Sequence, residues 1–325
     1  MPLPGKCQVG VGSVNCRAGN GSVNCQVVAG QLRQEVASAY PLKIIAPHAG
    51  GDASSCHQGL RPAVSYLMTY GGGLVHGDRI HVDVRVGPKC ALVLLTQGST
   101  KVFRRQAKAS ASSGEQTLQT IVADVEPGAL LCLLPDPVTC FEDAAYSQRQ
   151  AVTLHGPTSS VVLLDWMTSG RMSRGERWAF AKYFSVNLIR TTAATASSHA
   201  EVVVVRDALL LQKRQGFARR LEPFDALALI LVLGPAVAGV AQTFRDEHRA
   251  QRIKPFRPNA AQEHASEESG IQWSVSEVDE LGVTGVAVRA AGPSTEALKD
   301  WIKRRLALLQ PTIGDCAWSM YANSF

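Results

Sequence analysis

The sequence predicts a mainly β protein with an extended antiparallel architecture and two helices in its last third. Between Val64 and Leu211, apolar segments with the two-residue period of β-strands follow one another at short, regular spacing, with few helical patterns between them. A wound α/β sheet would instead alternate strands with helices. After Asp225 the pattern changes to strand, turn and helix.

Residues 80–86 predict the first clear strand of this series. Apolar side chains occupy the even positions from Ile80 to Val86, and polar ones occupy His81, Asp83 and Arg85, as a strand with one solvated face requires. Residues 91–95 are apolar throughout, so we expect them to form a central strand.

Two hairpins are predicted further along the chain. The first joins residues 117–125 to residues 129–134 through the turn Glu126-Pro127-Gly128, and the second joins residues 202–205 to 208–211 through Arg206-Asp207. Residues 161–164 predict a further short strand between them.

The last third repeats one unit twice. A strand over residues 226–233, Gly234-Pro235 and a helix to about Arg252 are echoed by a strand over residues 283–290, Gly292-Pro293 and a helix that opens at Ser294. We expect these two helices and no others. The polar stretch from Pro255 to Gly270 between the units predicts a mobile surface loop.

Composition narrows the class of protein. The chain has 325 residues, 46% of them apolar, and 33 Lys and Arg against 27 acids, with the basic residues scattered and aromatics at only 6%. These values predict a soluble protein that does not bind nucleic acid. The uncharged span between Asp225 and Arg245 approaches the length of a membrane helix, but Gly234-Pro235 interrupts it, so no membrane association is expected.

The eight cysteines, with no apolar signal segment before them, indicate reduced thiols and a cytoplasmic location. Cys90, Cys132 and Cys140 lie in or beside apolar runs and are expected in the core. Near the start of the chain, Gly12-Ser13-Val14-Asn15-Cys16 repeats as Gly21-Ser22-Val23-Asn24-Cys25. A metal-gathering arm is one interpretation, but without C-x-x-C spacing we favour a disordered tail over residues 1–30, followed by a single domain over residues 31–325.

The turn Tyr70-Gly71-Gly72-Gly73-Leu74-Val75-His76-Gly77-Asp78 invites a nucleotide interpretation, which its spacing excludes. A dinucleotide fingerprint counted from Gly71 would need a glycine where His76 stands, and a strand follows rather than a helix. The only Gly-Lys pair, Gly5-Lys6, does not belong to a phosphate loop.

Four motifs, in order along the chain, together resemble the urease accessory protein family called UreD or UreH. They are the turn from Tyr70 to Asp78; Thr96-Gln97-Gly98-Ser99-Thr100-Lys101-Val102-Phe103-Arg104; Leu134-Pro135-Asp136-Pro137-Val138 with Phe141-Glu142-Asp143-Ala144; and Gly170-Arg171 with Arg174-Gly175-Glu176-Arg177-Trp178. The resemblance runs from about residue 62 to the C-terminus. This sequence departs from the family pattern at His76, at Gly98 and in the Cys-repeating tail.

The resemblance implies a non-enzymatic chaperone rather than a catalyst. Such a protein would bind apo-urease and other accessory proteins, among them a GTPase, and assist nickel insertion while holding no cofactor tightly and Ni²⁺ only transiently. The resemblance also implies an elongated, helically coiled, β-helix-like arrangement of strands with two helices.

A route for nickel needs oxygen or nitrogen donors without a complete coordination shell. The candidates are acids in turns beside Gly or Pro, neighbouring hydroxyls and one imidazole: Asp78, Asp136, Glu142, Glu176, Thr96, Ser99, Thr100 and His76. Each acid also has a structural interpretation. Asp78 and Asp136 suit turn hydrogen bonds, and Glu176 has Arg171, Arg174 and Arg177 near it for a salt bridge.

The candidates for partner contact are Lys101, Arg104, Arg171 and Trp301. Lys101 and Arg104 are an odd number of positions apart on a probable strand and should face opposite sides. Trp301 lies on the apolar side of the final helix, which is a candidate docking surface although core packing is its default interpretation.

Two other function classes remain open from the residues alone. A β-fold hydrolase or esterase would need an organised nucleophile, but no G-x-S-x-G elbow occurs. A ligand-binding β domain, for carbohydrate for example, is disfavoured by the sparse aromatics.

Overall fold

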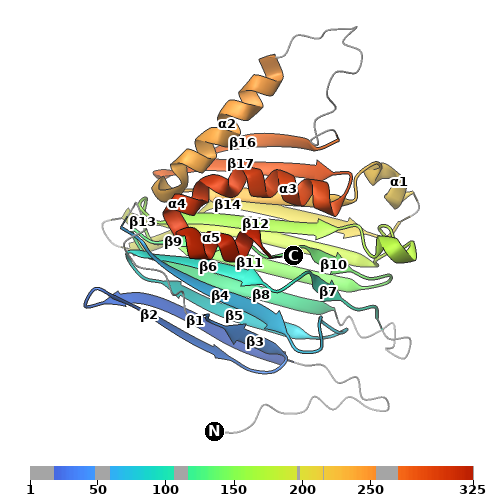
Figure 1. Cartoon of the computed structure of the whole chain (residues 1–325), viewed down its shortest axis with the longest axis horizontal. Coiled ribbons are helices and arrows are strands. Elements are labelled where there is room, and N and C mark those ends of the chain that lie inside the picture. Colours follow the sequence, from blue (N-terminus) through green and yellow to red (C-terminus); the bar gives the residue numbers. More distant parts are fainter. Residues whose placement is uncertain are drawn as a thin grey trace.

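The protein is built from two stacked β-sheets, with helices on the outer side of one of them (Figure 1). The computed structural model describes residues 18–47, 59–105, 116–195, 198–214, 216–253 and 270–324. All element bounds below refer to these residues.

Sheet A has seven strands in the order β14-β13-β11-β8-β5-β1-β2. Sheet B has ten, with the main order β16-β17-β15-β12-β9-β6-β4-β3 and the short strands β7 and β10 beside β12. The strands of sheet A are β1 Ala18–Val28, β2 Gln31–Ser38, β5 Arg79–Val86, β8 Thr117–Val125, β11 Ala145–Leu154, β13 Lys182–Thr195 and β14 Ser198–Gln212. Those of sheet B are β3 Leu42–Ile45, β4 Arg61–Thr69, β6 Cys90–Thr96, β7 Thr100–Val102, β9 Leu130–Leu133, β10 Val138–Cys140, β12 Ser160–Thr168, β15 Ala226–Leu233, β16 Gln272–Glu280 and β17 Val283–Gly292.

From β4 to β13 the longer strands alternate between the two sheets. β4, β6, β9 and β12 are parallel neighbours in sheet B, and β5, β8, β11 and β13 are parallel neighbours in sheet A. The prediction of antiparallel sheets is therefore wrong for the middle of the molecule, and both sheets are mixed. The finer prediction of a helically coiled, β-helix-like arrangement stays a prediction.

Both predicted hairpins are also wrong. The turn at Glu126-Pro127-Gly128 carries the chain from β8 in sheet A to β9 in sheet B, so the two strands never pair. Residues 202–211 form one continuous strand, β14, because Arg206-Asp207 contains neither Gly nor Pro to break it. The predicted strands over residues 80–86 and 91–95 are confirmed, and β6 is buried on both faces as expected.

Two hydrophobic clusters hold the layers together. One lies between the sheets and includes the inward side chains of β5, such as Val82 and Val84. The other lies between sheet B and the helices, and includes Phe244, Leu298 and Trp301. The predicted core cysteines Cys90, Cys132 and Cys140 are all buried.

The strand, turn and helix units of the last third are confirmed, with β15 before α2 and β17 before α3. Ser294 caps α3, its hydroxyl accepting a hydrogen bond from Ala297 N at 3.1 Å. The expectation of only two helices is wrong, because Pro311 and Gly314 divide the chain after α3 into two more short helices. The helices are α1 Phe217–Leu221, α2 Ala238–Ile253, α3 Thr295–Leu306, α4 Gln310–Ile313 and α5 Asp315–Ala322, with short 3-10 turns η2 Met172–Arg174, η3 Pro235–Val237 and η4 Ala307–Leu309.

The predicted tail over residues 1–30 is partly wrong. Residues 18–28 form β1, which pairs with β5 and β2 and buries Val23 and Cys25, because their alternating positions match those of a half-buried strand. Residues 1–17, with Cys7 and Cys16, lie outside the described residues, as does nearly all of the predicted loop from Pro255 to Gly270. Among the described helices, none combines the length and apolar character needed to cross a bilayer.

Candidate functional site

The four sequence motifs lie at one end of sheet B because each follows one of four adjacent parallel strands. The turn after β4 holds the first motif, the segment after β6 the second, the segment after β9 the third and the segment after β12 the fourth. Parallel strands bring their carboxyl ends to the same edge of a sheet, which is where sites in such sheets usually form. In Figure 1 this end carries the labels β7 and β10.

Backbone hydrogen bonds join the first motif to the second. Leu74 N donates to Lys101 O at 2.8 Å, and Phe103 N donates to Leu74 O at 2.9 Å. A Cβ atom at Gly73 would lie 2.6 Å from Lys101 O, so only glycine permits this close approach.

The second motif contacts the third through hydrogen bonds with the backbone and the side chain of Asp136. Its backbone N donates to Thr96 Oγ1 at 2.8 Å, and its Oδ2 accepts from Gly98 N at 3.0 Å. Thr100 N donates to Pro137 O at 3.0 Å, in the β7–β10 pair. The turn interpretation of Asp136 is thus correct, and the carboxylate ties two chain segments together.

The third and fourth motifs meet at Phe141. The Arg171 guanidinium lies 3.9 Å from the centre of the Phe141 ring, and Phe103 packs edge-on against the same ring at 5.1 Å. Glu176 Oε2 accepts from Arg171 Nε at 2.8 Å and from Glu142 N at 3.2 Å. At Gly170 a Cβ atom would lie 2.4 Å from Glu176 O, so this contact also requires glycine.

The acids predicted to line a nickel route occupy different environments. Asp78 is fully buried, and its Oδ2 accepts from Val75 N at 2.9 Å, as its turn interpretation predicts. His76 is buried in the same turn. Glu142 is exposed, and Glu176 forms the predicted salt bridge with Arg171. The Arg171 hydrogen bonds hold the pKa of Glu176 below its usual range.

The residues predicted to contact partners also differ in their exposure to solvent. Lys101 and Arg104 are both exposed, Arg104 lying beyond the end of β7, and Arg171 is partly exposed. Trp301 is fully buried, 5.3 Å from Trp273 and 6.1 Å from Phe244, ring centre to ring centre. Its prediction as a docking residue is wrong, because the apolar side of α3 packs on sheet B.

Sequence reasoning missed a buried polar cluster centred on Asp165 of β12. Asp165 is 8% exposed, and the groups among the described residues that donate hydrogen bonds to its carboxylate are neutral. Gln148 Nε2 and Tyr183 OH donate to Oδ1 at 2.6 and 3.2 Å, while Asn187 Nδ2 at 2.6 Å and the Ser185 hydroxyl donate to Oδ2. The feature of the sequence that could have predicted this cluster is the presence of an acid, Asp165, within an otherwise apolar strand.

Burial shifts the pKa of both interior acids in the same direction. It raises the pKa of Asp165, while the four donated hydrogen bonds act in the opposite direction. It also raises the pKa of Asp136, which the nearby Lys299 partly counteracts. Both acids therefore lie where a cation would compensate a real desolvation cost.

A small cavity of about 30 Å³ joins these acids, because Thr96, Thr100, Asp136 and Asp165 all line it. On one side it shares Thr96 and Thr100 with a cavity of about 570 Å³ that also includes Ser99 and Lys101. On the other side it shares Asp165 and Trp166 with a cavity of about 470 Å³ that reaches Asp207 and Arg289. Four of the predicted oxygen donors thus come together, whereas Asp78, His76, Glu142 and Glu176 line none of these three cavities.

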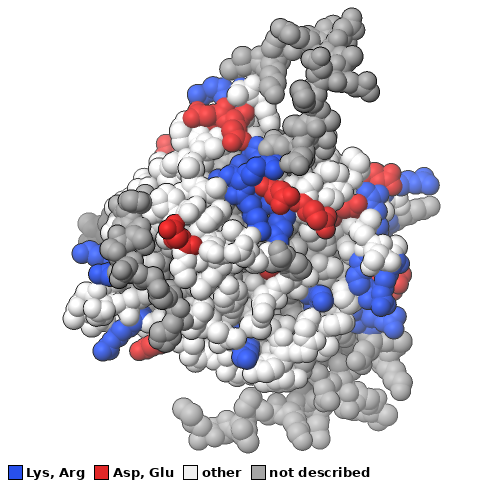
Figure 2. All heavy atoms as spheres, viewed as in Figure 1, with Lys and Arg blue, Asp and Glu red and all other residues white. Residues whose placement is uncertain are grey.

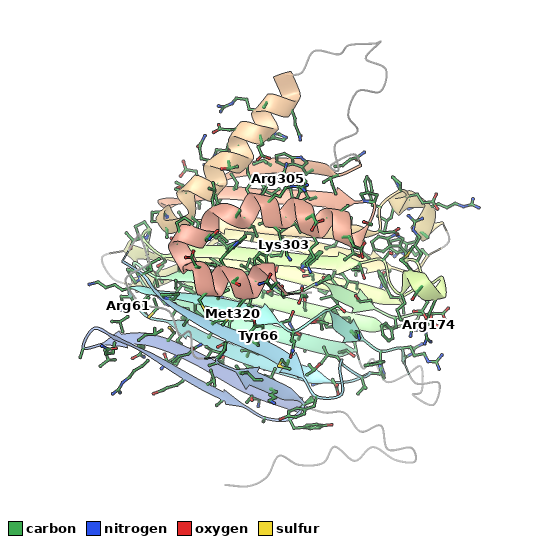
Figure 3. All side chains as sticks on the ribbon, viewed as in Figure 1. Arg61, Tyr66, Arg174, Lys303, Arg305 and Met320 are labelled. Atoms are coloured by element: carbon green, nitrogen blue, oxygen red, sulfur yellow. The ribbon has the colours of Figure 1, made fainter. Side chains whose placement is uncertain are left out.

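Within the described ranges, no three His, Cys, Asp or Glu side chains gather as a metal centre. Charged groups of both signs collect over α2 and α3 on the helix side (Figure 2). Figure 3 shows Lys303 and Arg305 on that side, and Arg174 at the end of the sheets that carries the motifs. Of the two interior acids, Asp136 is near enough to α3 for Lys299 and Lys303 to act on its pKa.

Comparison with known proteins gives one consistent result. The family model described as "UreD urease accessory protein" matches residues 20–320. Urease accessory protein D of Oryza sativa subsp. indica is 34% identical over 290 residues, covering 86% of this chain and 88% of the relative. The protein of the same name from Arabidopsis thaliana is 32% identical over 292 residues, covering 87% and 93%. UreD of Sorangium cellulosum is 34% identical over 276 residues, covering 85% and 75%.

Proposed function

The chain belongs to the UreD family of urease accessory proteins, and from this premise we propose that it binds apo-urease and other accessory proteins, among them a GTPase, and assists nickel insertion into urease. In this role it is a cytoplasmic maturation factor of the metallochaperone type and performs no catalysis. Nickel is its cargo and passes through without a permanent site.

The observation that carries the proposal is the meeting of buried and half-buried oxygen donors at cavities between the sheets. Four segments that the sequence marks as family motifs converge at one end of sheet B, and the donors Thr96, Thr100 and Asp136 face the small cavity from there. Asp165 lines the same cavity. Together they bring oxygen atoms from both ends of the proposed route to one interior cavity.

Asp165 has the chemistry that a transit point needs. Its carboxylate is negative when ionised, and its hydrogen-bonding neighbours are neutral, so the charge attracts a divalent cation. Its lone pairs are already occupied by four donors, so binding a metal ion requires exchanging hydrogen bonds rather than filling a ready coordination shell. Attraction without a complete shell lets an ion enter and leave.

The route follows the order of the cavities. An ion enters at the larger cavity beside Ser99 and Lys101, passes Thr96 and Asp136, reaches Asp165 and leaves toward Asp207. The central cavity of about 30 Å³ holds about one or two water molecules. Passage therefore requires the ion to shed most of its water, or the side chains at Thr96 and Trp166 to move.

Reconstitution of apo-urease tests the proposal. Purified apo-urease is incubated with the other accessory proteins, GTP and Ni²⁺, with and without this chain, and the nickel bound per urease active site is measured after gel filtration. We expect nickel incorporation to fall to the background level when the chain is omitted. Equal incorporation with and without it would refute the proposed function.

A further inference from the structure

Among the described residues, the main contacts of helices α2 to α5 lie away from the outer face of sheet A. The contacts of these helices lie with sheet B strands, chiefly β4, β6, β15, β16 and β17. α1 lies at one end of the sandwich, where Phe217 packs against Trp178 and Phe180. The central strands of sheet A therefore turn one side to the core and the other away from it.

The strand registers define what this face contains. Four neighbouring strands, β8, β11, β13 and β14, contribute three rows of outward side chains, which we call the open face. The first row is Leu118, Ser147, Phe184 and Leu210; the second is Thr120, Arg149, Val186 and Ala208; the third is Val122, Ala151, Leu188 and Arg206.

The open face is apolar in the main, with exposure that increases toward β14. Leu210 is 53% exposed and Phe184 and Val186 are half-buried, whereas Ser147, Ala151 and Leu188 are buried between their neighbours. Next to β8 the outward side chains of β5 are polar, with Arg79, His81 and Asp83 at the matching positions. An apolar centre with a polar border on one side is the pattern of a protein interface.

Charge identifies the kind of partner. The only charged groups in the open face are the exposed Arg149 and Arg206, and neither has an ion-pair partner among the described residues. A second copy seated face to face would bring these arginines together with no acid within the face to meet them. The complementary surface is therefore apolar with carboxylates at its border.

The position of the face singles out one such partner. Ala208 belongs both to the open face and to the lining of the cavity of about 470 Å³, beside Asp207 and Leu209. A protein seated on the open face and reaching over the edge strand β14 would thus cover the exit of the proposed route. The protein that receives the ion must sit at that exit.

We infer that the open face of sheet A, through Val186, Leu210, Arg149 and Arg206, is the surface that binds apo-urease. This inference rests on the proposed function, and it adds the surface and the chemistry of the contact. It requires an apolar patch bordered by Asp or Glu on apo-urease, and it leaves the entry cavity beside Ser99 and Lys101 free for a donor of nickel.

The test measures binding of purified apo-urease to the full-length chain. Val186→Glu, Leu210→Glu and Arg206→Glu change the open face, and Leu308→Glu makes the same change at a leucine of similar exposure, 50%, on the helix side. We expect each open-face variant to weaken binding at least about tenfold, and Leu308→Glu to leave it unchanged. Leu210→Ala, a milder change, should weaken it less, and circular dichroism checks that all variants fold.

Two outcomes would overturn the inference. One is wild-type affinity of the open-face variants for apo-urease. The other is lost affinity for a purified accessory protein while apo-urease still binds. Failure of the proposed function has a different signature, because the wild-type chain would then neither bind apo-urease nor raise its nickel content.

Discussion

Sheets A and B contain the same parallel ladder of strands but have different surroundings. Sheet B lies between sheet A and the helices, and β6, β9 and β12 are buried on both faces. In sheet A, β5 turns one side to the core and the other away from it, so buried and less buried positions alternate along the strand. Sheet B therefore fixes the positions of the motif loops, whereas within the described ranges no helix among α2 to α5 contributes a main contact to the outer side of sheet A. If the inferred docking on the open face is correct, stability rests mainly on sheet B and recognition on sheet A.

The largest expected effect on stability is in sheet B, the sheet that the helices cover. Trp301→Ala removes a fully buried ring from the cluster between sheet B and the helices, and should cost about 3–5 kcal/mol of unfolding free energy. Urea denaturation followed by tryptophan fluorescence and circular dichroism measures it. A loss as small as that of a surface substitution would contradict the assignment of Trp301 to the core.

Between the two sheets, Asp165→Asn should lower the unfolding free energy by about 1–3 kcal/mol. The amide cannot accept at both of its positions, and Asn187 Nδ2 must donate there because its Oδ1 already accepts from Gln150 at 3.0 Å. The same denaturation experiment checks this, with Asp124→Asn at a half-exposed acid as the control. Equal stability of the Asp165 variant and wild type would mean that the cluster does not require a carboxylate.

At the motif end, the Arg171–Glu176 pair predicts a small pH effect. The pKa of Glu176 is lower in the folded chain than its ordinary value of 4.5, so the pair stabilises above that value and the contribution is lost as the pH falls through the folded pKa. Because the pair is partly exposed, about 0.2–1 kcal/mol is expected. Glu176→Gln should flatten the dependence of the urea midpoint on pH as the pH falls below 4.5. An unchanged slope would show that the pair contributes nothing.

The smallest effect belongs to the open face. Leu210→Ala should change the unfolding free energy by less than about 0.5 kcal/mol, because half of the side chain is already in water. Thermal and urea unfolding measure it beside Trp301→Ala. A loss of several kcal/mol at Leu210 would mean that this face is part of the core, and the contrast between the layers would disappear.

The sequence predicts those features of the fold that depend on residues close together in the chain. Alternation along residues 80–86, the cap at Ser294 and the Gly-Pro turns are local, and the structure confirms them. Parallel pairing depends on the partner strand, which no local pattern specifies, so the turn at Pro127 was predicted to close a hairpin that does not exist.

The same limit applies to the site. Motif residues Thr96, Thr100 and Asp136 were predicted as neighbours in function and meet at one cavity, because their loops follow parallel strands. Asp165 was missed, since its donors come from β11 and β13, and only the stacking of the sheets brings them together. The sequence leaves Trp301 as a docking candidate beside its default interpretation as a core residue, because helical periodicity shows which side is apolar but not what covers it; the structure buries it.

Nickel transfer by the Asp165→Asn variant tests the central claim most directly. Apo-urease is loaded in the reconstituted system with wild-type chain or with the variant, at a temperature where both are folded, and nickel per active site is counted together with affinity for apo-urease. The account predicts that the variant binds apo-urease normally and delivers several-fold less nickel. Delivery at the wild-type rate by a folded Asp165→Asn chain would contradict a route between the two sheets.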